Sequence, residues 1–331
     1  MTELHSKQDL DQYIEKADIL VEALPYIQEF RKKTVVIKYG GSFMYDEDIK
    51  QSIMDDVTLM KFVGLRPIIV HGGGKDISAM LDNLEIQTEF IDGYRVTNEE
   101  SVGVAEMVLS GKINKDIVQL LEDRNTPAVG ISGKDGGMLK VTKKFINQMD
   151  IGFVGEISEV HDNLIETLLK NDYVPVIAPI GSDENGQSYN INADHAAYAI
   201  AKALKAEKLI YLTDTDGVYF DPDDPDSAIR RLNVDDVSGL IEQGVISGGM
   251  IPKVTNAVDA IAGGVNSVHI LDGKIPHSIL LELFTAAGCG TMIHKPYPAN
   301  RHRFVRSREL KQAKEAALQS EQQTEQQAQN Q

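Results

Sequence analysis

The sequence predicts an α/β fold with a mainly parallel β-sheet that helices cover on both faces. Short apolar segments rich in Val and Ile alternate with segments of helical periodicity along most of the chain, an order typical of parallel sheets. Glycine-rich turns join the first two predicted strands to the helices that follow them. The length of 331 residues, of which 42% are apolar, is enough to bury a large core.

The first predicted element is an amphipathic helical arm over residues 1–30. From Leu10 to Ile27, apolar residues recur three and four positions apart, which is the spacing of one helix face. Pro25 lies inside this pattern. Because proline lacks a backbone N–H and clashes with the preceding turn, we expect it to kink or split the helix.

The main domain is expected to span residues 31–298. Its first half alternates strand 34–38, helix 46–62, strand 67–70 and helix 75–84. Residues 86–97 and 139–159 mix β-forming residues with Gly and Asp, a pattern typical of hairpins, and helix 99–124 and strand 127–131 lie between them. The alternation resumes with strand 174–178, helix 193–204, strand 209–212, helix 251–262, strand 267–271 and helix 277–284.

The last segment, residues 299–331, differs in composition from the rest of the chain. It is charged at first and then rich in Gln and Glu. Such a composition cannot bury enough apolar surface to fold alone. We expect residues 306–331 of this polar tail to be partly helical or disordered.

The composition argues against several classes of protein. A net charge of −17 is unsuited to a nucleic-acid surface, where basic side chains supply most of the attraction. The single cysteine, Cys289, leaves no intramolecular disulfide and no multi-cysteine metal site, and no other metal-binding motif occurs. No apolar stretch approaches the roughly 20 residues of a membrane-spanning helix, and the start lacks the features of a secretory signal. We therefore expect a cytoplasmic protein.

Glycine-rich loops follow the first two predicted strands. Lys38 ends the first strand, and Gly40 and Gly41 form the turn after it, at the edge where open α/β sheets bind ligands. A tight turn beside a solvent-exposed lysine explains this loop equally well. The second loop, residues 72–74, leads directly into a helix. Glycine N–H groups at a helix start favour a phosphate or a carboxylate.

Polar residues also gather at later strand ends and helix starts. Arg95 lies on a β-like segment and suits either bidentate contact with a carboxylate or a surface salt bridge. Asn190, Asn192 and Asp194 precede an alanine-rich helix, and capping accounts for only one or two of them. Two more segments complete the set: Thr213, Asp214 and Gly217 after a strand, and Gly249 and Lys253 at the start of a helix.

Taken in order, these motifs resemble those of the amino-acid kinase family, and most closely its members that phosphorylate N-acetyl-L-glutamate. The resemblance rests on segments 38–41, 71–74, 93–97, 190–194, 213–218 and 249–253, and it runs from about residue 34 to residue 293. It implies a three-layer αβα sandwich around a mainly parallel sheet of about eight strands. It also implies an N-terminal lobe, about 31–185, for the acyl substrate and a C-terminal lobe, about 186–298, for ATP.

The resemblance assigns a role to each candidate residue. Lys38 and Lys253 grip the phosphoryl group during its transfer, and Asp194 positions both lysines. The implied substrate-binding residues are Gly73, Gly74, Arg95 and Asn190. The implied phosphate- or nucleotide-binding residues are Gly40, Gly41, Thr213, Asp214, Gly217 and Gly249. No metal ligand is expected in the chain, because Mg²⁺ arrives with ATP. A carboxylate acceptor is already ionised at neutral pH, so the reaction needs alignment and charge neutralisation rather than a base.

The resemblance also implies regulation and assembly. The arm, segment 267–273 and Glu282 are similar to parts of the arginine-inhibited members. We therefore expect feedback inhibition by L-arginine at a site that includes His269 and Glu282. The arm is expected to join dimers into a homo-hexamer, the alternative being an arm that packs on its own subunit. A PII-type signalling protein is a further candidate partner.

Two other functions stay open at the level of sequence. One is a kinase for N-acetyl-aminoadipate, since a single methylene is worth only about 1 to 3 kcal/mol of discrimination. The other is a non-catalytic sensor of arginine or nucleotide on the same fold. A sensor has no evident need for Lys38, Asp194 and Lys253 together.

Overall fold

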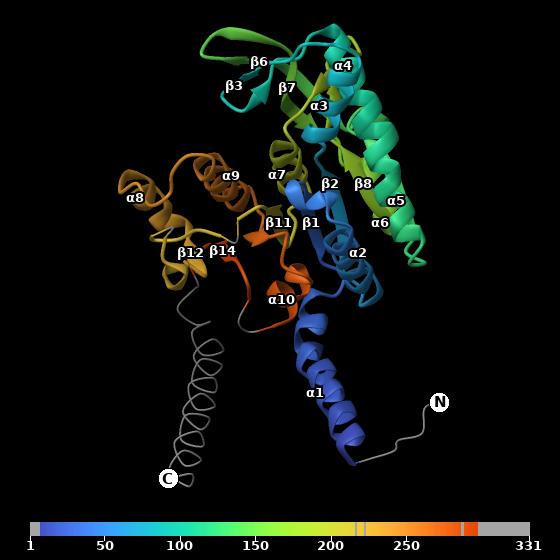
Figure 1. Ribbon diagram of the computed structural model, residues 1–331, viewed down its shortest axis with the longest axis vertical. Helices are drawn as coiled ribbons and strands as arrows, with labels where there is room; N and C mark the ends of the chain where they lie inside the picture. The colour runs from blue at the N-terminus through green and yellow to red at the C-terminus, as the bar shows by residue number, and fades with distance from the viewer. Residues whose placement is uncertain (1–6, 216, 222, 286–287, 297–331) are drawn as a thin grey trace. The chain divides into compact units, whose positions relative to one another are not determined.

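The computed structural model describes residues 7–215, 217–221, 223–285 and 288–296. Its centre is one eight-stranded sheet, drawn as arrows in Figure 1. In chain order, the strands of this sheet are β1 (Thr34–Tyr39), β2 (Arg66–His71), β5 (Ala128–Ser132), β8 (Val174–Ala178), β11 (Lys208–Thr213), β12 (Arg231–Asn233), β13 (Ser267–Asp272) and β14 (Thr291–His294). From edge to edge, their order is β12-β14-β13-β11-β1-β2-β8-β5.

Most strands of this sheet run in one direction. All neighbouring pairs from β13 to β5 are parallel. β14 pairs antiparallel with β13 and parallel with β12, so these two edge strands run the other way. At the centre, Val36 of β1 pairs with Ile68 of β2 on one side and Leu209 of β11 on the other. The predicted mainly parallel sheet is therefore confirmed.

Helices cover both faces and complete the predicted three layers. One face is covered by α2 (Glu47–Phe62), α3 (Gly74–Asn83), α4 (Glu99–Glu106), α5 (Asn114–Glu122) and α10 (Ser278–Phe284). The other is covered by α6 (Asn163–Lys170), α7 (Ala193–Ala203), α8 (Val237–Glu242) and α9 (Met250–Ala262). Successive residues of a strand point to opposite faces. Val35 and Ile37 of β1 accordingly join the core under α2, and Val36 joins the core under α7.

The helix predicted over residues 99–124 contains a change of winding. α4 passes into a π-helical segment, η2 (Met107–Ile113), which continues as α5. π-helical turns inside α-helices are often found at functional sites. Leu109 and Ile113 of η2 pack against Gly73, where a methyl group would come within 2.2 Å of Ile113 Cδ1. The wide turn thus lies directly beside the second glycine loop.

The two predicted hairpins are present, and one of them belongs to a small closed barrel that the sequence did not predict. The first hairpin joins β3 (Phe90–Ile91) to β4 (Tyr94–Arg95). The second, of β6 (Leu139–Ile146) and β7 (Met149–Val160), closes into a barrel with β9 (Ile180–Ser182) and β10 (Ser188–Asn190). Asn190 ends β10 between Val154 of β7 and Ile180 of β9. The barrel therefore fixes the backbone position of a candidate substrate-binding residue.

The N-terminal arm is one helix, α1 (Lys7–Phe30), which continues through Pro25, so the helix is not split there. The carbonyl of Val21 loses its helical partner at the proline, but Val21 is 66% exposed, so water can take that bond. Phe30 at the end of the helix is buried, and α1 contacts α10. Figure 1 shows the rest of α1 extending away from the sheet.

Two predictions concern the ends of the chain and membranes. The polar tail predicted over residues 299–331 lies outside the described residues. Among the described helices, none has the length and apolar character needed to cross a membrane.

Candidate active site

Two neighbouring cavities lie where the parallel strands end. The larger, of about 710 Å³, is lined by the loops after β1, β2 and β11 and by the first turns of α7 and α9. The smaller, of about 200 Å³, lies between the second glycine loop, the β3–β4 hairpin and the end of β10. Residues 72–74, Asn192 and Ala193 line both cavities. Ligands in the two cavities would thus meet at this shared wall.

Two lysines and one aspartate form the centre of the larger cavity. Lys38 lies on β1, Lys253 in the first turn of α9 and Asp194 in the first turn of α7. The Lys38 Nζ lies 3.1 Å from Asp194 Oδ1, and the Lys253 Nζ donates to Asp194 Oδ2. Each of these three side chains is at most 22% exposed. One carboxylate therefore holds two ammonium groups side by side in a largely enclosed place.

The electrostatics of this cluster favour a bound anion. Burial lowers the pKa of Lys38, which Asp194 opposes and Lys253 reinforces. For Asp194, burial would raise the pKa, but Lys38 and Lys253 together hold it below its ordinary value. Two ammonium groups share one carboxylate, so the cluster has an excess positive charge when both lysines are protonated. An oxyanion between the lysines would neutralise that charge.

The three polar residues at the start of α7, Asn190, Asn192 and Asp194, have different roles. Asn192 is the N-cap, and its side chain accepts hydrogen bonds from Asp194 N at 2.9 Å and His195 N at 3.3 Å. Asp194 is thereby left to face the lysines, and Asn190 faces the smaller cavity. Capping accounts for one of the three residues only. The sequence did not identify Asn192 as a cavity residue, although its cap position beside Asp194 signalled it.

The first glycine loop lies against the lysines. Gly40 accepts a hydrogen bond from Lys38 Nζ at 2.8 Å, and a methyl group on Gly40 would meet that Nζ at 3.0 Å. On Gly41, a methyl group would come within 2.5 Å of the Phe43 ring. Larger residues at either position would displace these neighbours. The loop can therefore bring its backbone close to a ligand in the larger cavity.

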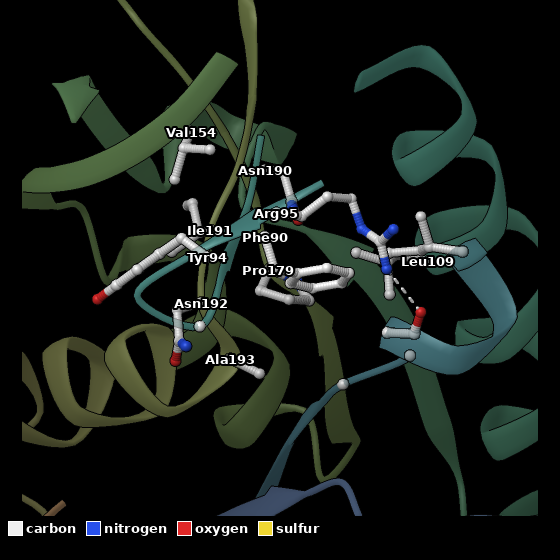
Figure 2. A pocket seen from close by; sticks show the side chains of 15 residues that line it. Phe90, Tyr94, Arg95, Leu109, Val154, Pro179, Asn190, Ile191, Asn192 and Ala193 are labelled. Atoms are coloured by element: carbon white, nitrogen blue, oxygen red, sulfur yellow. Dashed lines mark hydrogen bonds between the residues drawn. The ribbon is translucent and has the colours of Figure 1, made fainter. Parts of the chain in front are cut away.

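Arg95 is the cationic group of the smaller cavity and is only 6% exposed. Its Nη2 donates to Gly74 O at 2.9 Å and Ser78 Oγ at 2.7 Å, and its Nη1 donates to Thr88 Oγ1 at 3.2 Å. Figure 2 shows Arg95 and Asn190 with apolar side chains around the same cavity. A guanidinium has five N–H donors. Three are used here, so donors remain for a carboxylate.

The predicted nucleotide-binding residues divide between two places. Thr213, Asp214 and Gly249 line the larger cavity, and Ser42 N donates to Asp214 at 2.9 Å, which ties the loop after β11 to the first glycine loop. Gly217 instead packs against Thr291, whose Oγ1 would lie 2.5 Å from an added methyl group. Gly217 is absent from the described lining of both cavities.

His269 and Glu282 lie apart from the cavities, in a buried polar cluster near the end of α1. The Nδ1–H of His269 donates to Glu282 Oε1 at 2.6 Å, and Lys208 Nζ donates to His269 Nε2 at 3.0 Å. Lys208 also lies 4.9 Å from the ring centre of Phe30, the last residue of α1. Sequence reasoning missed Lys208, whose signal was a lysine next to an apolar strand. Cys289 N donates to Glu282 Oε2 at 2.9 Å.

Burial and hydrogen bonds set the charges of this cluster. Burial lowers the pKa of His269 to about 4, and the nearby Lys208 ammonium adds to the effect. Burial would raise the pKa of Glu282, but hydrogen bonds from His269 and from the Cys289 and Gly290 N–H groups lower it to about 2. At neutral pH the cluster therefore contains a neutral imidazole and an ionised carboxylate.

The described ranges contain no group of three or more His, Cys, Asp or Glu side chains arranged to hold a metal ion. In the larger cavity, Asp194 is engaged by two lysines and Asp214 by Ser42. The side chains offered there are those that bind anions.

A comparison with family models gives a match to the model described as "Amino acid kinase family" over residues 33–272. The chain belongs to the amino acid kinase family. The matched range of this kinase includes Lys38, Arg95, Asp194, Lys253 and His269. It does not include the arm or Glu282.

Named relatives narrow the similarity within the amino acid kinases. The acetylglutamate kinase of Heliobacterium modesticaldum is 53% identical over 291 residues, which cover 85% of this chain and 99% of the relative. The acetylglutamate kinase of Carboxydothermus hydrogenoformans is 51% identical over 292 residues, with coverage of 86% and 99%. The predicted resemblance to acetylglutamate kinases is therefore confirmed.

Solved structures give the same fold. N-acetylglutamate synthase from Neisseria gonorrhoeae, complexed with coenzyme A and N-acetyl-glutamate, matches with a TM-score of 0.75 and 27% identity. The match covers 85% of this chain and 64% of the synthase. Carbamate kinase from Giardia lamblia bound to AMP-PNP has a TM-score of 0.61 at 20% identity, covering 80% of this chain and 99% of that kinase. This second likeness concerns the fold alone.

Proposed function

We propose that this amino acid kinase transfers the γ-phosphoryl group of ATP to the side-chain carboxylate of N-acetyl-L-glutamate, in the cytoplasm and as an early step of arginine biosynthesis. The products are N-acetyl-L-glutamyl 5-phosphate and ADP. The observation that carries the proposal is the Lys38–Asp194–Lys253 cluster, which lies in the larger of two cavities that share a wall. The acetylglutamate kinases at 51–53% identity support the choice of substrate.

The cluster suits phosphoryl transfer to a carboxylate. The nucleophile is already ionised, so the enzyme has to align two anions and reduce their repulsion. We assign Lys38 and Lys253 to the oxygens of the transferred group, with Asp194 keeping the two ammonium groups in place. Backbone N–H groups of Gly40 and Gly41 add further donors. Because Asp194 is fixed before substrates bind, this electrostatic stabilisation is preorganised.

The larger cavity fits a nucleotide that brings its own Mg²⁺. Its lysines and glycine loop are suited to phosphates, and Thr213, Asp214 and Gly249 are assigned to the nucleotide's border. Mg²⁺ commonly binds through substrate phosphates with few protein ligands, which agrees with the engaged carboxylates of this cavity. Bound to the phosphates, it would neutralise negative charge there. Gly217 is assigned an indirect role, since its packing on Thr291 holds the loop that follows β11.

The smaller cavity is assigned to the acyl substrate. Arg95 would take the α-carboxylate, and Asn190 the acetamido group. Gly73 and Gly74 form the wall toward the larger cavity, where the side-chain carboxylate must reach the phosphoryl group. We propose that the N lobe, about 31–185, holds most of the acyl substrate and the C lobe, about 186–298, holds ATP, with Asn190 at the start of the C lobe completing the smaller cavity.

We further propose feedback inhibition by L-arginine at the buried cluster beside α1. The ionised Glu282 carboxylate suits a guanidinium or ammonium group, and Lys208 suits a carboxylate. The Glu282 carboxylate already accepts hydrogen bonds from His269, Cys289 N and Gly290 N. Arginine would therefore have to replace some of these donors. Phe30 brings the end of the arm to the cluster. Arginine binding and the position of the arm would thus be coupled.

The arm is assigned to assembly. Leu10, Tyr13, Ile14, Leu20 and Val21 of α1 are between 45% and 72% exposed, an apolar surface that a second subunit could cover. We propose that arms join dimers into a homo-hexamer. Binding of a PII-type protein stays a prediction from the resemblance.

The test is ADP release by the purified full chain with MgATP and N-acetyl-L-glutamate. L-glutamate, L-aspartate and N-acetyl-aminoadipate serve as matched acceptors, and each is repeated with L-arginine. We expect turnover with N-acetyl-L-glutamate and a loss of about 10²-fold or more in Lys38→Ala or Lys253→Ala. Faster turnover with N-acetyl-aminoadipate would favour the related kinase. ATP or arginine binding without turnover on any acceptor would favour the sensor.

A further inference from the structure

A third lysine, Lys75, lines the larger cavity and has no role in the mechanism above. It follows the second glycine loop directly and lies in the first turn of α3. Lys38 and Lys253 both pair with Asp194, but none of the ion pairs among the described side chains involves Lys75. Lys75 is also exposed, so its ammonium group can meet a ligand.

The Lys75 ammonium group is held over an aromatic ring. Its Nζ lies 5.1 Å from the ring centre of Tyr45, within the range of a cation–π interaction. Tyr45 also lines the larger cavity and ends the short 3₁₀ turn Ser42–Tyr45 after the first glycine loop. Lys75 thus reaches from the second glycine loop across to the first.

Hydrogen bonds fix the Tyr45 ring. Its hydroxyl donates to Asp76 Oδ2 at 2.7 Å, and Lys112 Nζ donates to Asp76 Oδ1 at 2.9 Å. Burial and Asp76 raise the pKa of Tyr45, so the phenol stays a donor. Both oxygens of Asp76 are therefore engaged away from Lys75. The carboxylate next to Lys75 in sequence orients its aromatic support instead of pairing with it.

Lys75 decides the balance of charged side chains in the larger cavity. Three lysines, Lys38, Lys75 and Lys253, and two aspartates, Asp194 and Asp214, line it. Without Lys75, lysines and aspartates would balance, although the proposed reaction brings a polyphosphate and a carboxylate together. Lys75, on α3, supplies the excess positive charge.

We propose that Lys75 is a further phosphate-binding residue, which contacts the phosphate chain of the bound nucleotide from the side of the two glycine loops. Tyr45 and Asp76 act as positioning residues, since the Tyr45 ring lies under the Lys75 ammonium group and Asp76 accepts the hydrogen bond of the Tyr45 hydroxyl. The inference rests on the proposed function in taking a nucleotide as the ligand. It adds a cation that none of the roles above includes.

The test compares Lys75→Gln and Lys75→Arg with the full-length wild-type chain. Lys75→Gln should raise the KM for MgATP about three- to tenfold, the range of one partly exposed charge contact, because solvent screens the lysine. The KM for N-acetyl-L-glutamate should stay within about twofold, and Lys75→Arg should restore most of the loss. Lys170→Gln serves as the control, since Lys170 is 68% exposed on α6 and lines neither cavity.

Salt dependence and Tyr45 variants separate a phosphate contact from a structural effect. In Lys75→Gln, the KM for MgATP should depend less on ionic strength, because one charge contact is gone. Tyr45→Leu removes the ring and should raise the KM for MgATP, whereas Tyr45→Phe keeps the ring and should have a smaller effect. In the double variant Lys75→Gln/Tyr45→Leu, the loss of MgATP binding free energy should be smaller than the sum of the losses in the two single variants.

Direct binding of MgATP, measured by calorimetry, keeps the inference testable apart from the acceptor. If the wild-type chain binds MgATP but does not phosphorylate N-acetyl-L-glutamate, the proposed function fails and a weaker affinity in Lys75→Gln still supports this contact. An unchanged affinity and an unchanged KM for MgATP in Lys75→Gln would overturn it. If the wild-type chain binds no MgATP, both proposals fail.

Discussion

Replacing Asp194 by asparagine keeps the shape of the side chain and removes the charge that holds two ammonium groups together. Lys38 and Lys253, at 12% and 22% exposure, would then lose the carboxylate that pairs with both of them. Removing one preorganised electrostatic group from an active site commonly lowers kcat by about 10²- to 10³-fold. We expect a loss of this size in Asp194→Asn, because the change misplaces both lysines.

The same change should alter the pH profile. Burial already lowers the pKa of Lys38, and Asp194 is the main group opposing that shift. Without the carboxylate, the pKa of Lys38 should fall further. Activity that needs the Lys38 ammonium is lost as pH rises through its pKa, so the alkaline limb of kcat/KM should move to lower pH.

The assay is ADP release as a function of pH, with unfolding temperature as a check on the fold. Breaking a fully buried ion pair costs about 3–5 kcal/mol, and we expect a smaller loss of stability here because these side chains are partly exposed. Asp259→Asn is the matched control, since Asp259 pairs with Lys202 on the surface. A folded Asp194→Asn enzyme with near-normal kcat and an unmoved alkaline limb would refute the reasoning.

Three further predictions follow from single features of the structure. Gly73→Ala should raise the KM for N-acetyl-L-glutamate, because the new methyl group meets Ile113 at 2.2 Å, whereas Gly103→Ala on α4, with no atom within 4 Å and no place in the lining of either cavity, should change little; equal effects would contradict the packing. Burial raises the pKa of Asp56 from 3.8 to about 6, so the free energy of unfolding should fall by at most about 3 kcal/mol as pH rises from 4 to 6. Asp56→Asn should flatten that fall, measured by urea unfolding, and a wild-type pH dependence in this variant would exclude Asp56 as its source. Glu282→Gln and deletion of residues 1–24 should each abolish inhibition by arginine and keep the basal turnover. The deletion should also lower the mass of the oligomer, measured by light scattering. Full inhibition in either variant would refute the effector site.

The strands and helices of the central layers were predicted correctly, because their positions depend mainly on residues that are close together in the chain. The predicted strand 34–38 appears as Thr34–Tyr39 and the predicted helix 46–62 as Glu47–Phe62. Hydrophobic periodicity and the Asp46 N-cap, which accepts from Ile49 N, are both visible in sequence. The strand-end rule also located Lys38 and Thr213 at one sheet edge, since β1 and β11 are adjacent and parallel.

Features that depend on packing between distant segments were not predicted. The π-helical turn at Met107–Ile113 has ordinary helical residues, and its fit to Gly73 exists only in the folded chain. The small barrel needs pairing of β6, β7, β9 and β10 across intervening segments. Pro25 was expected to kink or split α1; the helix is not split, because the carbonyl that loses its partner is exposed to solvent. Gly217 reads as a nucleotide-loop glycine, yet its contact is with Thr291 on β14.

The pairing of charged side chains in the site could not be predicted from the sequence either. Asp76 sits beside Lys75 in the chain, and proximity alone would suggest that they pair. Hydrogen bonds to Tyr45 and Lys112 direct the carboxylate elsewhere. Similarly, nothing local indicates that Lys208 and Glu282 would enclose His269.

The central claim is that a phosphoryl group passes to the side-chain carboxylate of N-acetyl-L-glutamate. An acyl phosphate reacts with hydroxylamine to give a hydroxamate, so trapping identifies the atom that is phosphorylated. The account predicts hydroxamate of N-acetyl-L-glutamate in step with ADP, and almost none from Lys253→Ala. ADP release without hydroxamate, or no ADP release above the rate without acceptor, would contradict it.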